Sequence, residues 1–177
     1  MSTGTDGGCF AYTLSQAFFL LMPPITAVLL TKNDALRLGR CLETLYPCDH
    51  IIVVDHGSQD HTLSLAREYG ARIVKAMPGV PRLGSYGSPG SSWLLFLDPR
   101  ESLSESLAAS LYEWRWGGDP HSPYSLFLRE ETAQGWSELP RAQTRLVPRN
   151  WDRWDGMLPA DISCPALEGP LLRFAFP

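Results

Sequence analysis

The sequence predicts an α/β fold built on a mostly parallel sheet with a small antiparallel addition. Three observations lead to this fold class: short apolar runs alternate with helical patterns, the connections between them are short, and polar residues gather directly after the runs. Strands and helices that alternate in this way give parallel strands joined by right-handed crossovers. With 177 residues, the chain has enough material for one domain with a continuous core.

The first half of the chain supplies the alternating elements. Apolar and partly β-branched runs, typical of strands covered on both faces, predict strands at residues 25–31, 51–54, 71–75 and 93–97. Helical patterns between capping and stop residues predict helices at residues 35–46, 61–69 and about 102–116. Pro47 and Gly70 stop the first two helices, and Ser102 or Ser104 caps the third.

The second half of the chain is less regular. A segment dense in Gly, Pro and Ser predicts a loop over residues 77–92. Residues 124–129 and 142–147 are expected to pair as antiparallel strands. Residues 171–177 are expected to form either a last docked strand or a frayed end.

We divide the chain into an N-terminal extension, a domain and a C-terminal tail, at residues 1–22, 23–160 and 161–177. The apolar residues 17–22 end at Pro23, well short of the ~20 residues that a membrane helix needs. Residues 1–16 contain no Lys or Arg, which argues against a signal peptide. Translation starting at Met22 instead of Met1 is a second interpretation of this extension.

Composition excludes two classes of function. A formal net charge of −4 gives no electrostatic reason to bind nucleic acid, whose phosphates are met by Lys and Arg. Cys9, Cys41, Cys48 and Cys164 lack any CxxC spacing, which argues against a compact zinc site and a disulfide framework. We therefore expect a cytoplasmic protein, with peripheral association at the inner face of the membrane left open.

Polar residues follow three of the predicted strands. Thr31, Lys32 and Asn33 follow the first, residues 55–58 the second, and residues 98–101 the fourth. Because ligands of an open α/β sheet bind beyond the carboxyl ends of its strands, these segments predict one cleft.

The segments around these polar residues are also similar in sequence to a known enzyme family. Residues 25–33, 51–62, 66–71 and 93–101 resemble family 2 glycosyltransferases of the GT-A type, particularly the branch of lipopolysaccharide-core sugar transferases. The resemblance covers about residues 23–160. It implies a three-layer α/β/α sandwich and an inverting transfer of sugar from a nucleotide-sugar donor to a glycan or lipid-linked acceptor hydroxyl.

The resemblance also implies roles for individual donor-binding residues. Asp55 would bind the nucleotide base, Asp98 would lie near the ribose or diphosphate, and the donor pocket would be lined by Thr31, Asn33, Gly57 and Ser58. A carboxylate suits base N–H and sugar hydroxyl donors. The structural alternative is that Asp55 and Asp60 cap the next helix, while Thr31 and Asn33 are a strand end and a helix cap.

The chain departs from the family at the metal motif. Where the family has an Asp-x-Asp pair that holds Mg²⁺ or Mn²⁺, this chain has Asp98, Pro99 and Arg100. Arginine cannot ligate a metal. Either Arg100 meets the diphosphate with its guanidinium group, or Glu101 joins Asp98 as a substitute metal ligand.

A second departure concerns the catalytic base. The His-Glu pair of related transferases is replaced by Pro159 and Ala160, so Asp155 and Asp161 are only weak candidates and the base is unassigned. A catalytically inactive protein that binds a nucleotide or a partner is therefore the alternative function. A nucleotidyltransferase-like enzyme is a third hypothesis, although no glycine-rich basic segment follows the first strand.

Overall fold

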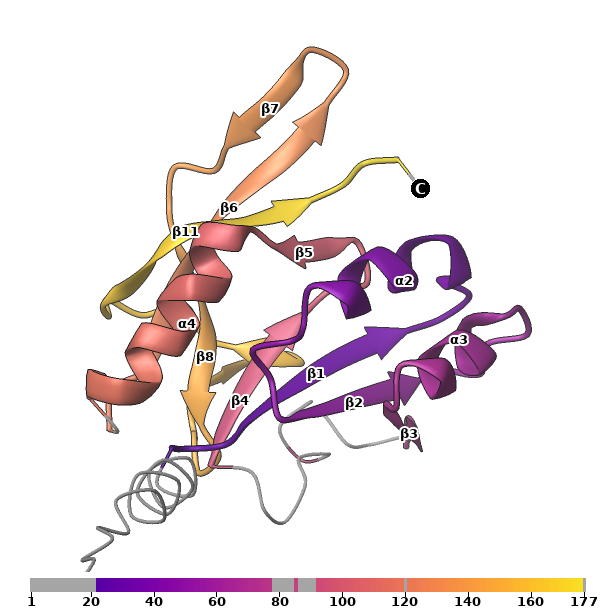
Figure 1. The fold of residues 1–177 in the computed structure, drawn as a ribbon, viewed down its shortest axis with the longest axis horizontal. Coiled ribbons are helices and arrows are strands. Elements are labelled where there is room, and N and C mark those ends of the chain that lie inside the picture. Colours follow the sequence, from indigo (N-terminus) through magenta and orange to yellow (C-terminus); the bar gives the residue numbers. More distant parts are fainter. Residues whose placement is uncertain (1–21, 78–84, 86–91, 120, 177) are drawn as a thin grey trace, which may run out of the picture.

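The computed structural model describes residues 22–77, 85, 92–119 and 121–176 (Figure 1). One sheet contains β1 (Ile25–Thr31), β2 (His50–Asp55), β3 (Arg72–Lys75), β4 (Trp93–Leu97), β5 (Glu101–Leu103), β6 (Tyr124–Thr132), β7 (Gly135–Glu138), β8 (Gln143–Pro148) and β11 (Ala166–Arg173). A separate short hairpin consists of β9 (Trp154–Asp155) and β10 (Leu158–Pro159). The helices are α2 (Ala35–Glu43), α3 (Thr62–Glu68) and α4 (Glu105–Gly117).

The sheet has a parallel part and a mixed part. Its strand order is β3-β2-β1-β4-β8-β6-β11-β5, and β7 pairs with β6. The first four strands of this order are mutually parallel, as predicted, while β8 is antiparallel to both β4 and β6. The carboxyl ends of β1, β2 and β4 therefore lie at one edge, which confirms the predicted α/β class.

Alternation along the strands builds two apolar clusters, one on each face. Ile25, Ala27 and Leu29 of β1 face the helices, where they pack with residues such as Leu38 and Leu111. On the opposite face, a second cluster contains Val28, Ile52, Val54, Leu94, Phe96 and Val147, partly covered by Trp151, Trp154 and Met157. Among the described elements, α2, α3 and α4 share one face, so the β9–β10 segment serves as the outer layer on the other.

The structure differs from the prediction mainly in its C-terminal half. Residues 101–103, expected at a helix start, form β5, and Ser104 caps α4 by accepting a hydrogen bond from Leu107 N at 3.2 Å. Of the two outcomes left open for the last residues, a docked strand is found, because β11 pairs with both β6 and β5. The sheet thus continues beyond residue 160. Residues 1–21 of the predicted extension (residues 1–22) and most of the predicted 77–92 loop lie outside the described residues.

The loops after β1 and β2 are joined by hydrogen bonds. Asn33 N donates to Ser58 Oγ at 3.0 Å, and Gln59 N donates to Asn33 Oδ1 at 2.8 Å. Asn33 has a left-handed backbone, φ 57°, which asparagine tolerates better than most residues. The two loops are therefore one structural unit.

Asp55 organises the turn after β2. Its carboxylate is 6% exposed and accepts hydrogen bonds from Gly57 N at 2.9 Å, Ser58 N at 3.0 Å and Ser58 Oγ at 2.5 Å. Burial alone would raise the pKa of Asp55, but the hydrogen bonds from Ser58 and Gly57 outweigh it and lower the pKa. The turn is thus built on the charged form of this side chain.

We predict that Asp55→Asn destabilises the protein at neutral pH by on the order of 2 kcal/mol, because an amide N–H₂ cannot accept from the turn. A lowered folded-state pKa contributes stability that is complete above the unfolded pKa, and it is lost as pH falls through the folded value. Urea unfolding should therefore show a wild-type advantage that shrinks below about pH 4. The exposed Asp152→Asn should show no such trend, and a pH-independent deficit in Asp55→Asn would contradict the explanation.

Two glycines with positive φ allow a matched test of packing between β11 and α4. Gly169 (φ 88°) has no room for a side chain, because a Cβ would lie 2.4 Å from Leu107 N. Gly135 (φ 114°) has open space at the same place. We predict that Gly135→Ala costs about 1–2 kcal/mol from backbone strain alone, and that Gly169→Ala costs about 1–3 kcal/mol more. Equal losses in urea unfolding would show that the close approach to α4 is unimportant.

Candidate functional site

Three adjoining cavities follow the carboxyl ends of β1 and β4, and we call them together the strand-end cleft. The first, about 320 Å³, is lined by Leu30, Asp34, Arg37, Asp98, Pro99, Arg100 and Ala175. The second, about 330 Å³, is lined by Leu30, Leu97, Asp98, Arg145, Asp155, Met157, Leu158 and Arg173. The third, about 480 Å³, is lined by Gln143, Thr144, Arg145, Trp154, Asp155, Leu158, Pro159, Ala160 and Asp161. Neighbouring cavities share lining residues, so the cleft is continuous.

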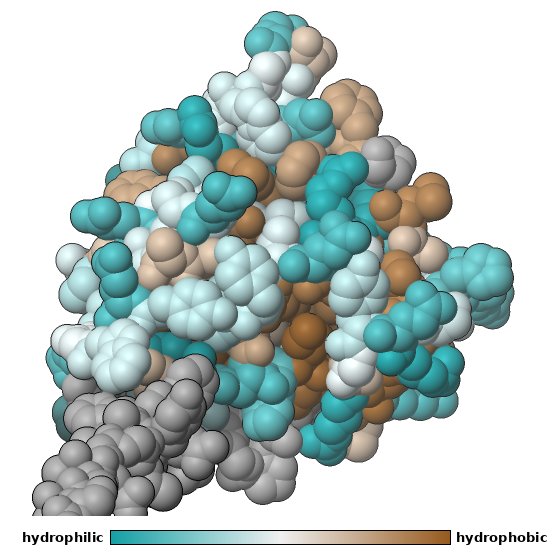
Figure 2. All heavy atoms as spheres, in the orientation of Figure 1, coloured by the Kyte–Doolittle hydropathy of each residue, from teal (hydrophilic) through white to brown (hydrophobic). Residues whose placement is uncertain are grey.

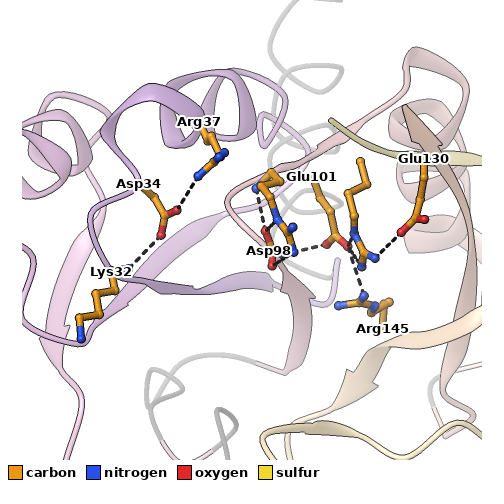
Figure 3. Close-up of polar contacts among 9 residues, drawn as sticks. Lys32, Asp34, Arg37, Asp98, Glu101, Glu130 and Arg145 are labelled. Carbon is orange, nitrogen blue, oxygen red and sulfur yellow. Dashed lines mark hydrogen bonds and ion pairs between the residues drawn. The ribbon is translucent and has the colours of Figure 1, made fainter. Parts of the chain in front are cut away.

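Asp98 and Arg100 form a two-point ion pair at the border of the first two cavities (Figure 3). Arg100 Nε donates to Asp98 Oδ1 at 2.9 Å, and Arg100 Nη2 donates to Oδ2 at 3.2 Å. Burial would raise the pKa of Asp98, but the hydrogen bonds and charge of Arg100 lower it. Both carboxylate oxygens are therefore occupied by the residue that replaces the second aspartate of the family motif.

Glu101 lies directly behind this pair and is fully buried. Its Oε1 accepts from Arg173 Nη2 at 2.7 Å and from Arg145 Nη2 at 3.2 Å, while its Oε2 accepts from Asp98 N at 2.8 Å. Arg173 Nη1 also donates to Glu130 Oε1 at 2.6 Å (Figure 3). The residues of this cluster come from β5, β6, β8 and β11 and surround one carboxylate.

The donor set does not fit a divalent cation in this arrangement. Mg²⁺ and Mn²⁺ prefer carboxylate oxygens, and both carboxylates of the predicted metal site are held by guanidinium groups. Glu101, the predicted second metal ligand beside Asp98, contacts two arginines whose charge would repel a cation, and metal ligation by Asp98 and Glu101 stays a prediction. Within the described ranges, no three His, Cys, Asp or Glu side chains are grouped to hold a metal ion.

The other predicted donor-binding residues lie beside the strand-end cleft instead of lining its cavities. Thr31 and Asp55 are register partners at the ends of β1 and β2, and Asn33, Gly57 and Ser58 belong to the joined loops. The Thr31 hydroxyl is buried and has no hydrogen-bond partner among the described residues. The structural alternative for Asp55, a cap of the next helix, is not found: its carboxylate accepts from Gly57 and Ser58 of its own turn, and Asp60 accepts from Thr62 N at the start of α3. Nucleotide contact by these five residues stays a prediction.

The two weak candidates for the base are both in the cleft, but their surroundings differ. Asp155 lines the second and third cavities, is exposed, and its carboxylate makes no hydrogen bond or ion pair with another described residue. Asp161 lines the third cavity, where its Oδ1 accepts a hydrogen bond from Thr144 N at 2.8 Å. Only Asp155 combines a central position with an uncommitted carboxylate.

Sequence reasoning missed three cleft arginines, Arg37, Arg145 and Arg173. Arg145 follows the polar Gln143 and Thr144 in β8, yet it is only 3% exposed. Its ion-pair partner lies 44 residues away and cannot be read from the pattern. Arg37 Nε is buried with no hydrogen-bond partner in the described part of the chain, and its ion pair to Asp34 is long, at 3.8 Å.

A larger cavity, about 500 Å³, lies at the opposite end of β2 and is lined by residues that include Leu42, Leu45 and Ile51. Figure 2 shows apolar side chains at the surface between α2 and α3. None of the predicted site residues lines this cavity, and it lies at the amino ends of the strands, where α/β sheets rarely bind ligands. No helix in the described ranges is long and apolar enough to cross a membrane.

No protein-family model matches the chain. The chain is 39% identical over 176 residues to the lipopolysaccharide core biosynthesis glycosyltransferase LpsC of Rhizobium meliloti, an alignment that covers 85% of this chain and 63% of LpsC. It is 33% identical over 94 residues to an uncharacterized glycosyltransferase of Rickettsia felis, covering 49% of this chain and 32% of that protein. The chain therefore spans less than two thirds of these relatives' length.

The crystal structure of S. aureus TarS is similar in fold, with a TM-score of 0.51 at 14% sequence identity, over 71% of this chain and 28% of that one. This likeness supports the predicted fold type. Together, the comparisons confirm the resemblance that the sequence predicts: the chain is related to glycosyltransferases, including one of lipopolysaccharide core biosynthesis, and has the GT-A fold.

Proposed function

We propose that this protein transfers a sugar from a nucleotide-sugar donor to a hydroxyl group of a glycan or lipid-linked acceptor, with inversion at the sugar carbon. The observation that carries the proposal is the 39% identity to a lipopolysaccharide core glycosyltransferase over 85% of the chain. The strand-end cleft supports it, because ligands of α/β sheets bind where this cleft lies. The expected setting is the cytoplasm, at the inner face of the membrane if the acceptor is lipid-linked.

The division of the cleft suggests where each substrate binds. In our proposal the donor diphosphate occupies the first two cavities, beside Asp98 and Arg100, and the acceptor enters through the third. Asp155 lies between the two groups of cavities, and we assign it the role of general base. Its uncommitted carboxylate would take the proton of the acceptor hydroxyl as that oxygen bonds to the anomeric carbon, while the bond from this carbon to the diphosphate breaks and the nucleoside diphosphate leaves.

A calorimetric screen of nucleotides and nucleotide sugars, in EDTA and in Mn²⁺, tests the proposal, followed by hydrolysis and transfer assays on each ligand that binds. We expect at least one nucleotide sugar to bind and to be turned over with a glycan or lipid-linked acceptor. No binding of any nucleotide under either condition would overturn the proposal.

We predict that Asp155→Asn lowers the turnover number about 10²- to 10⁴-fold while nucleotide affinity stays unchanged, because the amide cannot accept the proton. Asp161→Asn is the matched control: its amide oxygen still accepts from Thr144 N, and it should keep near wild-type turnover. Steady-state transfer assays and calorimetry on both variants make the comparison. A loss in Asp161→Asn but not in Asp155→Asn would reverse the assignment.

A non-catalytic protein that binds a nucleotide or a partner is the second candidate function. The observation that favours it is that Asp98 and Glu101 are both held by arginines, while Pro159 and Ala160 stand where related enzymes have a His-Glu pair. Binding of a nucleotide sugar without hydrolysis or transfer, for every acceptor tested, would favour this function over the first.

A further inference from the structure

Four arginines line the first two cavities of the strand-end cleft, which share Leu30 and Asp98. Arg37 and Arg100 line the first cavity, and Arg145 and Arg173 line the second. The acidic residues that line the same two cavities are Asp34, Asp98 and Asp155. Guanidinium groups therefore outnumber carboxylates on these walls, whereas a site for a divalent cation needs carboxylate oxygens directed inward.

Arg145 has the surroundings of a ligand-binding side chain. It is 3% exposed, yet it lines both the second and the third cavity. Its hydrogen bonds to described residues all leave from Nη2, at 3.2 Å to Glu101 Oε1 and 2.6 Å to Gln143 Oε1. The N–H groups on Nε and Nη1 make no hydrogen bond to a described residue, and neither is among the buried atoms that lack a partner, so they are open to the cavities and can donate to a ligand there.

Glu101 fixes this guanidinium in place. One of its oxygens, Oε1, accepts from Arg145 and from two nitrogens of Arg173, which holds both groups at the back of the second cavity. Glu101 itself is fully buried and cannot reach a ligand. It is a positioning residue for the two arginines.

Arg100 supplies an exposed guanidinium group at the rim. Its side chain is 45% exposed and lies at the border of the two cavities, paired with Asp98. A planar guanidinium matches two phosphate oxygens as well as it matches a carboxylate, so Arg100 can pass from Asp98 to an incoming diphosphate.

We propose that the diphosphate of a nucleotide donor binds in the first two cavities through Arg100 and Arg145, and that this binding needs no divalent cation. This inference rests on the proposed function, since it identifies how the same cleft holds the donor. The altered metal motif leaves two roles open, contact of Arg100 with the diphosphate or metal ligation by Glu101, and this inference chooses the first.

Calorimetric titration with UDP and with GDP, in EDTA and in Mn²⁺, tests the inference directly. We expect the diphosphate that binds to do so in EDTA with an affinity within about threefold of that in Mn²⁺. Arg100→Ala and Arg145→Lys should each weaken it about tenfold or more, because a charge-assisted hydrogen bond is lost. Arg67→Ala removes the same charge from the exposed surface of α3 and should change the affinity less than about twofold.

The outcomes separate this inference from the proposed function. Binding that requires Mn²⁺, or wild-type affinity in both cleft variants, overturns the inference, and sugar transfer in Mn²⁺ would then leave the proposed function standing. No nucleotide binding in either buffer overturns both. Because Arg145 is buried, thermal unfolding of Arg145→Lys is measured alongside, and the surface variant Arg100→Ala carries the test if Arg145→Lys does not fold.

Discussion

The buried carboxylate of Glu101 is the interaction on which the candidate site depends. It accepts hydrogen bonds from Asp98 N and from the guanidinium groups of Arg145 and Arg173, so it joins the end of β4 to β8 and β11. Two arginines would be left without their partner if it were removed, and breaking a buried ion pair typically costs about 3–5 kcal/mol. Beyond the backbone pairing of the sheet, this one side chain therefore links cleft residues from three strands.

The ion pairs to arginine limit the chemistry that the carboxylates of Glu101 and Asp98 can perform. An oxygen that accepts from two guanidinium groups cannot also approach a divalent cation, since the arginines would repel it. At the cleft surface, both oxygens of Asp98 likewise accept hydrogen bonds from a guanidinium group, that of Arg100. These hydrogen bonds and the charge of Arg100 lower the pKa of Asp98. Arg100, which replaces the second aspartate of the family motif, therefore fits its surroundings. The neighbouring Glu101 is likewise paired with arginines, Arg145 and Arg173, and not free to bind a cation.

The sequence predicted the parts of the fold that local pattern controls. The four parallel strands, α2, α3 and the Ser104 cap follow from apolar runs and capping residues a few positions apart. The sequence also located Asp98 at the cleft. It could not locate Arg145 or Arg173, because their partner Glu101 is 44 and 72 residues away and nothing local signals such pairing. For β11, the sequence left a docked strand open only from residue 171, because Gly169 and Pro170 interrupt the earlier pattern. The strand is stabilised by β6 and β5, which are distant in sequence.

The hydrogen bonds and ion pairs of the other cleft carboxylates also explain why we propose Asp155 as the general base. In the first two cavities, Asp34 and Asp98 are paired with arginines, and in the third, Asp161 accepts from the backbone at Thr144. Asp98 is a weaker base for this reason, because Arg100 favours its charged form and lowers its pKa. Asp155 lies on the short β9–β10 hairpin, whose Trp154 packs edge-on against Phe96 of β4 at 5.6 Å between ring centroids. The hairpin is thus anchored by its aromatic residue, while the adjacent Asp155 lines two cavities and its carboxylate has no partner among the described residues.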